Sequence, residues 1–168
     1  FEDDSPATDA GAGHLGLAYY TSGVYYSTFT IDPAQLRRSW SGFSGKTARS
    51  QVEALVKSLV EALPSGKLTN TNAHTKPLLV LVENQKTRTV YEFETPVSRS
   101  DDGGYTQTSV AALARQYASA REFDADNFVD SIVYTSVGGE FADAARVGSI
   151  DEVASRTAAL AFAQGEPS

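Results

Sequence analysis

The chain has 168 residues, 41% of them hydrophobic, which suits one domain with a buried core, and it contains no run of about 18 apolar residues that could span a membrane. The absence of cysteine excludes disulfides, thiolate zinc sites and cysteine nucleophiles, and is typical of a cytoplasmic protein. The formal net charge of −7 argues against a nucleic-acid-binding surface only if the chain is complete, and a start at Phe1 without any methionine predicts a fragment of a longer protein.

The first predicted elements are a polar segment and a long strand. Residues 1–13 carry four acids and a proline without periodicity, so we expect a solvated loop. Residues 16–32 hold four of the eight tyrosines, and their alternating aromatic and aliphatic positions indicate a strand with one buried face. A straight strand over 17–31 would be about 50 Å long, too long for a compact domain, so Gly23 is the expected bend.

Two helices are predicted next. Pro33 favours a turn or a short helix over 33–40, and Trp40 is expected to pack at the edge of the core. Residues 46–63 repeat apolar side chains at three- and four-residue steps, which predicts an amphipathic helix ending at Pro64. Because its apolar stripe is one-sided, we expect this helix to lie on a sheet.

The remaining chain alternates polar loops with further elements. Residues 65–77 form a long polar connection with two lysines and one histidine, and long loops often carry function. The apolar run 78–83 predicts a strand covered on both faces. Further patterns predict an exposed strand over 88–94, a helix over 108–123, a strand over 128–137 and a final helix opened by the capping box Ser149–Glu152.

The order of these elements predicts the topology. Strand 17–31, helix 46–63 and strand 78–83 make a right-handed crossover that places two parallel strands in one sheet. In ferredoxin-like and RNA-recognition folds another strand lies between them. The sequence offers no strand for that place, so we expect the first half of the fold upstream of Phe1.

The sequence contains no convincing active site. His14 and His74 lack a second histidine or cysteine at metal-ligand spacing, so no metal site is expected. A hydrolase that uses His74 and a nearby acid remains one hypothesis. Loop 65–77 is the other candidate, because its lysine, threonine, asparagine and serine groups can hold phosphate and sugar, and nearby tyrosines can stack on bases. A solvent-facing loop beside tyrosines that only pack is the alternative.

An ordered series of motifs resembles the CasC backbone subunit of the type I-E CRISPR Cascade complex. The motifs are GHLG over 13–16, TSGVYY over 21–26, IDPAQL over 31–36 and LPSGK over 63–67. The similarity covers roughly the first hundred residues.

This resemblance implies an α+β fold, a modified RNA-recognition-motif (ferredoxin-like) palm that is incomplete in this chain. Within a single domain over 1–168, residues 1–13 would be the returning arm of a thumb loop. Residues 14–97 would be the strand–helix–strand core, and residues 98–168 a C-terminal α/β extension. The tyrosines of 16–32 would then serve packing and subunit contacts.

The resemblance also implies a function. The chain would be a non-catalytic, cytoplasmic subunit without cofactor or metal that polymerises along the guide RNA (crRNA). Its partners would be guide RNA, neighbouring copies, other Cascade subunits and, through the guide, target DNA, with no membrane partner. The alternative is another single-stranded RNA-binding module of the same fold. The expected RNA-binding residues are Lys67, Thr69, Asn70, Asn72, His74 and Lys76.

Overall fold

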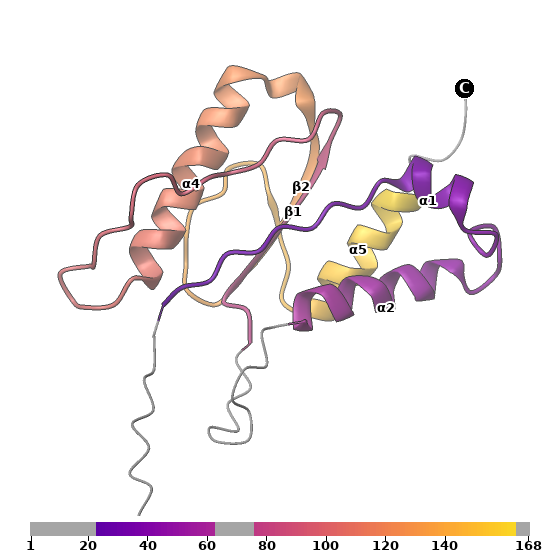
Figure 1. Cartoon of the computed structure of the whole chain (residues 1–168), viewed down its shortest axis with the longest axis horizontal. Coiled ribbons are helices and arrows are strands. Elements are labelled where there is room, and N and C mark those ends of the chain that lie inside the picture. Colours follow the sequence, from indigo (N-terminus) through magenta and orange to yellow (C-terminus); the bar gives the residue numbers. More distant parts are fainter. Residues whose placement is uncertain (1–22, 63–75, 164–168) are drawn as a thin grey trace, which may run out of the picture.

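The computed structural model describes residues 23–62 and 76–163, and Figure 1 shows their arrangement. Most predicted helices and strands are confirmed, with boundaries shifted by a few residues. The elements are α1 (Pro33–Ser39), α2 (Ala48–Glu61), β1 (Leu79–Gln85), α4 (Thr106–Phe123), the short 3-10 helix η1 (Ala125–Asn127), β2 (Phe128–Thr135), β3 (Ala145–Arg146) and α5 (Ile150–Ala163).

The strands form one three-stranded sheet in the order β1-β2-β3. Strands β1 and β2 are antiparallel, with Leu79 opposite Thr135, and the register shifts between Asn84 and Gln85. The two-residue strand β3 is parallel to β2. Within the described ranges, β1 therefore lies at one edge of the sheet.

Helices cover both faces of the sheet, with α4 on one side and α2 and α5 on the other (Figure 1). Alternate residues of the strands supply two cores. Ile132 joins Val52 and Val56 of α2 in the core beneath α5, whereas Val133 joins Leu113 and Tyr117 in the core beneath α4. The mixed composition of the layers confirms the α+β class and is consistent with a ferredoxin-like palm.

Local chemistry explains where the helices begin. The side chain of Asp32 accepts a hydrogen bond from the Gln35 N–H at 2.9 Å, and Pro33 occupies the first turn of α1. At α5, the Glu152 N–H donates to Ser149 Oγ at 3.2 Å, and the Glu152 carboxylate accepts from the Gly148 N–H at 3.1 Å. These bonds confirm the predicted capping box, with the reciprocal bond moved by one residue.

The predicted strand over 17–31 is wrong for its described half. Residues 23–31 belong to no strand, and every residue from Gly23 to Thr30 is exposed. Residues 17–22 lie outside the described ranges. The alternating pattern records β propensity, but a strand exists only where a neighbouring backbone supplies hydrogen bonds, and β1 and β2 pair with each other instead.

The predicted strand over 88–94 is also wrong. This segment runs along α4, where Gln116 accepts from the Glu92 N–H at 2.8 Å and donates to the Glu92 C=O at 2.6 Å. Tyr91 is buried in the core beneath α4, and Phe93 packs against it. Its alternation of apolar and polar residues therefore reflects packing on a helix, and a side-chain amide takes the place of a neighbouring strand.

Two smaller expectations have definite outcomes. Helix α2 shares a core with strand residues, but its main packing partner is α5 rather than the sheet itself. Trp40 packs, as expected, with its ring edge-on to Phe43 at 6.1 Å between centroids. No helix of the described residues is long and apolar enough to cross a membrane.

Candidate nucleic-acid interface

The predicted RNA-binding loop joins the end of α2 to the start of β1. Of its six expected contact residues, only Lys76 lies within the described ranges, where it is exposed. The other five, Lys67, Thr69, Asn70, Asn72 and His74, lie outside them. The structure therefore places the Lys76 end of the predicted site at the entrance of β1.

The backbone that follows Lys76 is firmly anchored. The Leu78 carbonyl accepts from the Ser136 N–H at 2.9 Å and from the Ser136 hydroxyl at 3.2 Å. On the far side of this turn, Thr135 Oγ1 donates to the Gly138 carbonyl at 2.7 Å. The end of β2 thus fixes the direction in which the loop backbone enters the sheet.

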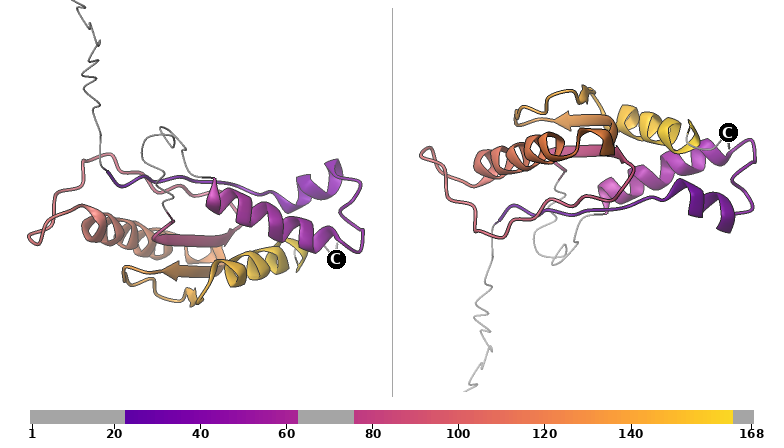
Figure 2. Two further views of the ribbon diagram at one scale, coloured as in Figure 1. Left: turned by 90° about the horizontal axis from the view of Figure 1, so that it is seen from below. Right: turned by 90° about the horizontal axis from the view of Figure 1, so that it is seen from above.

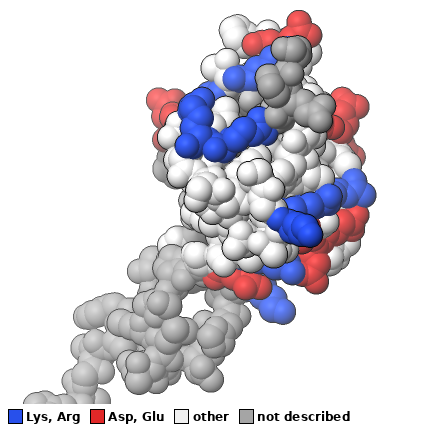
Figure 3. Space-filling model, turned by 90° about the vertical axis from the view of Figure 1, so that its right-hand side faces the viewer, with Lys and Arg blue, Asp and Glu red and all other residues white. Residues whose placement is uncertain are grey.

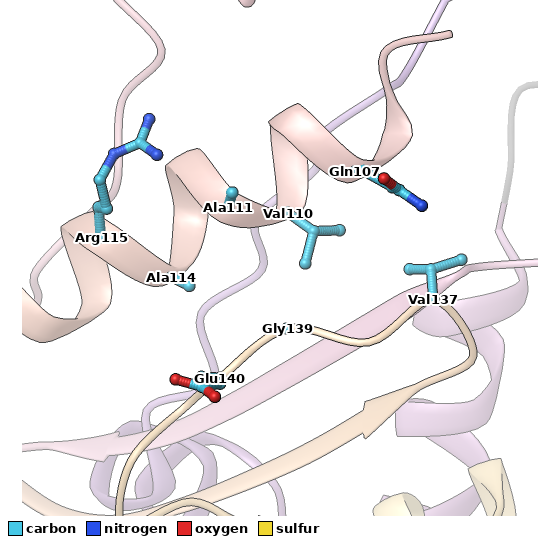
Figure 4. Close-up of a pocket in the computed structure, with 8 residues that line it drawn as sticks. All are labelled: Gln107, Val110, Ala111, Ala114, Arg115, Val137, Gly139 and Glu140. Atoms are coloured by element: carbon cyan, nitrogen blue, oxygen red, sulfur yellow. The ribbon is translucent and has the colours of Figure 1, made fainter. Parts of the chain in front are cut away.

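An open groove lies beside this entrance, between α4 and residues 137–140. Its volume is about 400 Å³, and Val110 and Val137 give it an apolar floor (Figure 4). Gln107, Arg115 and Glu140 supply the polar groups of its lining. A second hollow of about 370 Å³ shares Gln107 and Val137 and extends to Leu78. One cation opposed by one carboxylate makes this groove poorly suited to phosphate.

A basic, acid-free stretch of sequence at the α1–α2 end was missed by the sequence analysis. Residues 33–52 contain no acid, although the whole chain has 21 acids and only 14 lysines and arginines. The four cations of this stretch are Arg37, Arg38, Lys46 and Arg49. Figure 3 views the molecule from this end and shows Lys and Arg side chains beside Asp and Glu. The signal was available in the sequence as an acid-free run in an acidic chain.

A buried polar cluster connects β1, α4 and the segment over 88–94. Arg121 Nη2 lies 2.7 Å from Glu83 Oε1, and these side chains are only 15% and 8% exposed. The Tyr91 hydroxyl donates to the same carboxylate oxygen at 2.9 Å, and Arg121 also donates to Ser131. The guanidinium lies 3.4 Å from the centre of the Tyr117 ring.

This cluster has the character of a structural network. Burial raises the pKa of Tyr91 and of Tyr117 above the ordinary value of 10.0, and the negative charge of Glu83 adds to the shift for Tyr91. Across the described ranges, every buried side-chain nitrogen or oxygen has a hydrogen-bond partner. The network therefore keeps no polar group free for a ligand.

Metal chemistry finds no support in the part of the chain that the structure describes. No group of three histidine, aspartate or glutamate residues there could hold a metal ion. Both histidines, His14 and His74, lie outside these ranges, so the structure does not test the hydrolase hypothesis.

Comparisons with known proteins point to one class of assembly. A family model described as "CT1975-like protein" matches residues 2–156. The chain is similar to a solved chain described as "CRISPR RNA-guided surveillance complex", with 26% identity and a TM-score of 0.63 over 76% of this chain and 48% of that chain. A second, from a "CRISPR RNA-guided surveillance complex, pre-nicking", shows 25% identity and a TM-score of 0.52 over 70% of this chain and 33% of that chain.

The chain thus spans about half, or less, of the solved chains that it matches. No curated protein matches the sequence.

Proposed function

The chain belongs to the CT1975-like protein family, and we propose that it acts as a guide-RNA-binding backbone subunit of a CRISPR surveillance complex. The observation that carries this proposal is the similarity of 76% of the chain to a subunit of a CRISPR RNA-guided surveillance complex. The motifs over 13–67, which resemble the CasC subunit, support the same role.

In this role the chain is non-catalytic and works in the cytoplasm. Copies of it polymerise along the guide RNA, contact other subunits of the complex and meet target DNA through the guide. The RNA backbone is held by the loop between α2 and β1, with Lys67 and Lys76 as phosphate contacts. Thr69, Asn70, Asn72 and His74 add hydrogen bonds to phosphate and sugar.

The anchored entrance of β1 supports this assignment. An anchored backbone lowers the entropy that a lysine loses when it binds phosphate, and Ser136 fixes the residue two positions after Lys76. Residues 1–13 carry four acids and no lysine or arginine, whereas residues 65–77 carry two lysines and no acid.

The proposal is tested by measuring guide-RNA affinity as a function of salt in the assembled complex. We expect the double variant Lys67→Ala, Lys76→Ala to weaken binding equally for all guide sequences. Each lost phosphate contact should make the slope of log K against log salt less negative by about 0.7. Lys86→Ala is the matched control, since Lys86 is exposed just beyond the opposite end of β1.

Unchanged affinity and slope in the double variant would reject the loop as the RNA site. A loss of the same size in an Arg37→Ala, Arg38→Ala variant, with the loop variant unaffected, would move the site to the α1–α2 end. Regularly spaced nuclease protection along the guide distinguishes a polymerising backbone from a general single-stranded RNA-binding module, which would protect RNA without a fixed period. Turnover abolished by His74→Ala would favour the hydrolase instead.

A further inference from the structure

The connection between α1 and α2 brings four exposed cations to one end of the molecule. A turn bond from the Phe43 N–H to the Trp40 carbonyl at 3.1 Å folds this connection tightly. The exposed cations are Arg37, Arg38, Lys46 and Arg49. The nearest acids in sequence are Asp32, which caps α1, and Glu53, which pairs with Arg49. Cations therefore outnumber acids over residues 32–53, which we call the basic end.

An aromatic contact fixes the shape of the basic end. Phe43 is 8% exposed and stacks on Phe162 of α5, with 4.5 Å between the ring centroids. The guanidinium of Arg37 lies 4.9 Å from the centre of the Phe43 ring. An arginine that already packs on a ring loses less side-chain entropy when it binds a carboxylate. The basic end is therefore suited to bind a surface that carries carboxylates.

The turn between α4 and β2 carries the opposite charge. Residues 122–130 contain four acids and no lysine or arginine. All four acids are exposed: Glu122, Asp124, Asp126 and Asp130. On the adjoining segment Lys86 and Arg88 are also exposed, so the acids outnumber the cations here by four to two. We call residues 122–130 the acidic tip.

The acidic tip also carries apolar side chains that the fold leaves uncovered. Phe123 is 92% exposed and Val129 is 55% exposed. The backbone of the turn is held in place, because the Asn127 side chain accepts from the Thr87 N–H at 2.6 Å and donates to the Thr87 carbonyl at 2.9 Å. Apolar side chains surrounded by charged ones are typical of a protein–protein interface.

The two surfaces lie at separate ends of the molecule. In Figure 1 the acidic tip is at the top, where α4 leads into β2, and the basic end is at the right. Both views of Figure 2 place the α1–α2 connection at one extreme of the long axis, away from α4. One copy can therefore use both surfaces at once, each with a different neighbour. Joining unlike surfaces in this way gives an open array, whereas a twofold dimer would need both surfaces within one patch.

We propose that the basic end of one copy binds the acidic tip of the next copy of this chain. The cations of the basic end pair with carboxylates of the tip, and the Phe123 ring lies against a guanidinium. The chain already contains such a contact, since Arg121 lies 4.2 Å from the centre of the Phe128 ring. Nucleic acid would suit the basic end alone, whereas a second copy accounts for both surfaces.

This contact rests on the proposed function, because a backbone subunit must repeat along the RNA. It uses no residue of loop 65–77, so it can fail while the RNA site stands. It is also separate from the tyrosines of 16–32, to which the resemblance assigns subunit contacts.

The test is a charge swap in the whole protein, measured by sedimentation velocity with and without guide RNA. The variant Arg38→Glu, Lys46→Glu reverses the basic end and spares Arg37, which packs on a ring. The variant Asp124→Lys, Asp126→Lys reverses the acidic tip. We expect either variant alone to associate at least about tenfold more weakly than the wild type, because like charges then meet. An equimolar mixture of the two should regain association, because each reversed surface then meets its opposite.

The matched control is Asp101→Lys, Asp102→Lys, which reverses two exposed acids in the loop before α4 and should leave association unchanged. Unweakened association in either reversed variant overturns the contact. A mixture that associates no better than its components overturns it too, as does a control that weakens association equally. A wild-type protein that stays monomeric at millimolar concentration, both alone and on guide RNA, also overturns it.

A short RNA that holds a single copy separates this contact from the proposed RNA site. We expect the reversed variants to bind this RNA within about twofold of the wild type, because no neighbour takes part. Failure of the wild type to bind any RNA would reject the proposed function, and association between RNA-free copies would still test the contact. Loss of affinity for the short RNA in Arg38→Glu, Lys46→Glu, with association between copies unchanged, would show that the basic end binds RNA instead.

Discussion

The buried pair of Glu83 and Arg121 allows the most direct test of how this fold is held together. The substitution Arg121→Met keeps much of the side-chain volume and removes the guanidinium. Glu83, whose side chain is 8% exposed in the wild type, then loses the partner at 2.7 Å, although Tyr91 still donates to it. The change leaves the buried carboxylate without its ion-pair partner, and it also removes the hydrogen bond to Ser131 and the contact with the Tyr117 ring.

Removing one partner of a buried ion pair typically costs about 3–5 kcal/mol. The low exposure of both side chains places this pair in that class and not among surface pairs, which contribute about 0–1 kcal/mol. In a domain of this size each kcal/mol lowers the melting temperature by about 2–4 °C. We expect Arg121→Met to lower it by at least about 6 °C.

The assay is thermal unfolding for the melting temperature and urea unfolding for the free energy, both followed by circular dichroism, with a double variant and a surface control. Adding Glu83→Gln to Arg121→Met should recover part of the loss, because a neutral amide leaves no unpaired charge and still accepts from Tyr91. Arg49→Met removes an exposed pair with Glu53 at 3.4 Å and should cost about 0.5 kcal/mol or less. A loss below about 1 kcal/mol for Arg121→Met, or a double variant no more stable than the single one, would refute the reasoning.

Three further predictions concern a loop, the 3-10 helix η1 and α5. Gly139→Ala should destabilise the fold by more than about 1 kcal/mol in urea unfolding, because its new Cβ would lie 2.7 Å from a core side chain and its φ is +101°. The control Gly138→Ala places its Cβ within 4 Å of no atom and should cost less. Equal losses for the two variants would contradict this prediction. Asn127→Ala should cost about 1–3 kcal/mol and speed amide exchange at Thr87, whose N–H donates to the Asn127 side chain at 2.6 Å; unchanged exchange would contradict it. Hydrogen bonding by the Gly148 N–H holds the pKa of Glu152 below its ordinary value of 4.5. The ionised carboxylate therefore stabilises the fold above pH 4.5, and this stabilisation is lost as the pH falls through the pKa of Glu152 in the folded protein. Glu152→Gln should therefore be less stable than the wild type near neutral pH. When the free energy of unfolding is plotted against pH, the curves of the two proteins should converge at acid pH rather than stay parallel.

Much of the secondary structure could be predicted from the sequence, because side-chain periodicity reports burial. The helices α2 and α4 and the strands β1 and β2 follow patterns of apolar residues, and the start of α5 follows its capping residues. The same periodicity misled at 88–94, where Tyr91 and Phe93 alternate with polar residues because one face packs on α4. Alternation shows which side chains are covered, but not whether a strand or a helix covers them.

Part of the candidate site could likewise be predicted from the sequence, and part of it could not. Sequence chemistry and the resemblance selected the polar loop, and the structure adds only the position of Lys76 and the anchoring of the backbone behind it. The pairing of Glu83 with Arg121 could not be predicted, because ion-pair partners on different elements depend on how those elements pack. The acid-free stretch over 33–52, with its four cations, was visible in the sequence, and only the fold places it at one end of the molecule.

The sequence by itself determined the helices, the two main strands, the α+β class and the family resemblance, all of which depend on local patterns or ordered motifs. Only the tertiary structure decided the neighbours of β1. A backbone hydrogen bond needs a partner at the right distance, and the identity of that partner is not written in the side chains of either strand. For this reason residues 23–31, which have the composition of a strand, remain unpaired in the described structure, and one edge of β1 stays open.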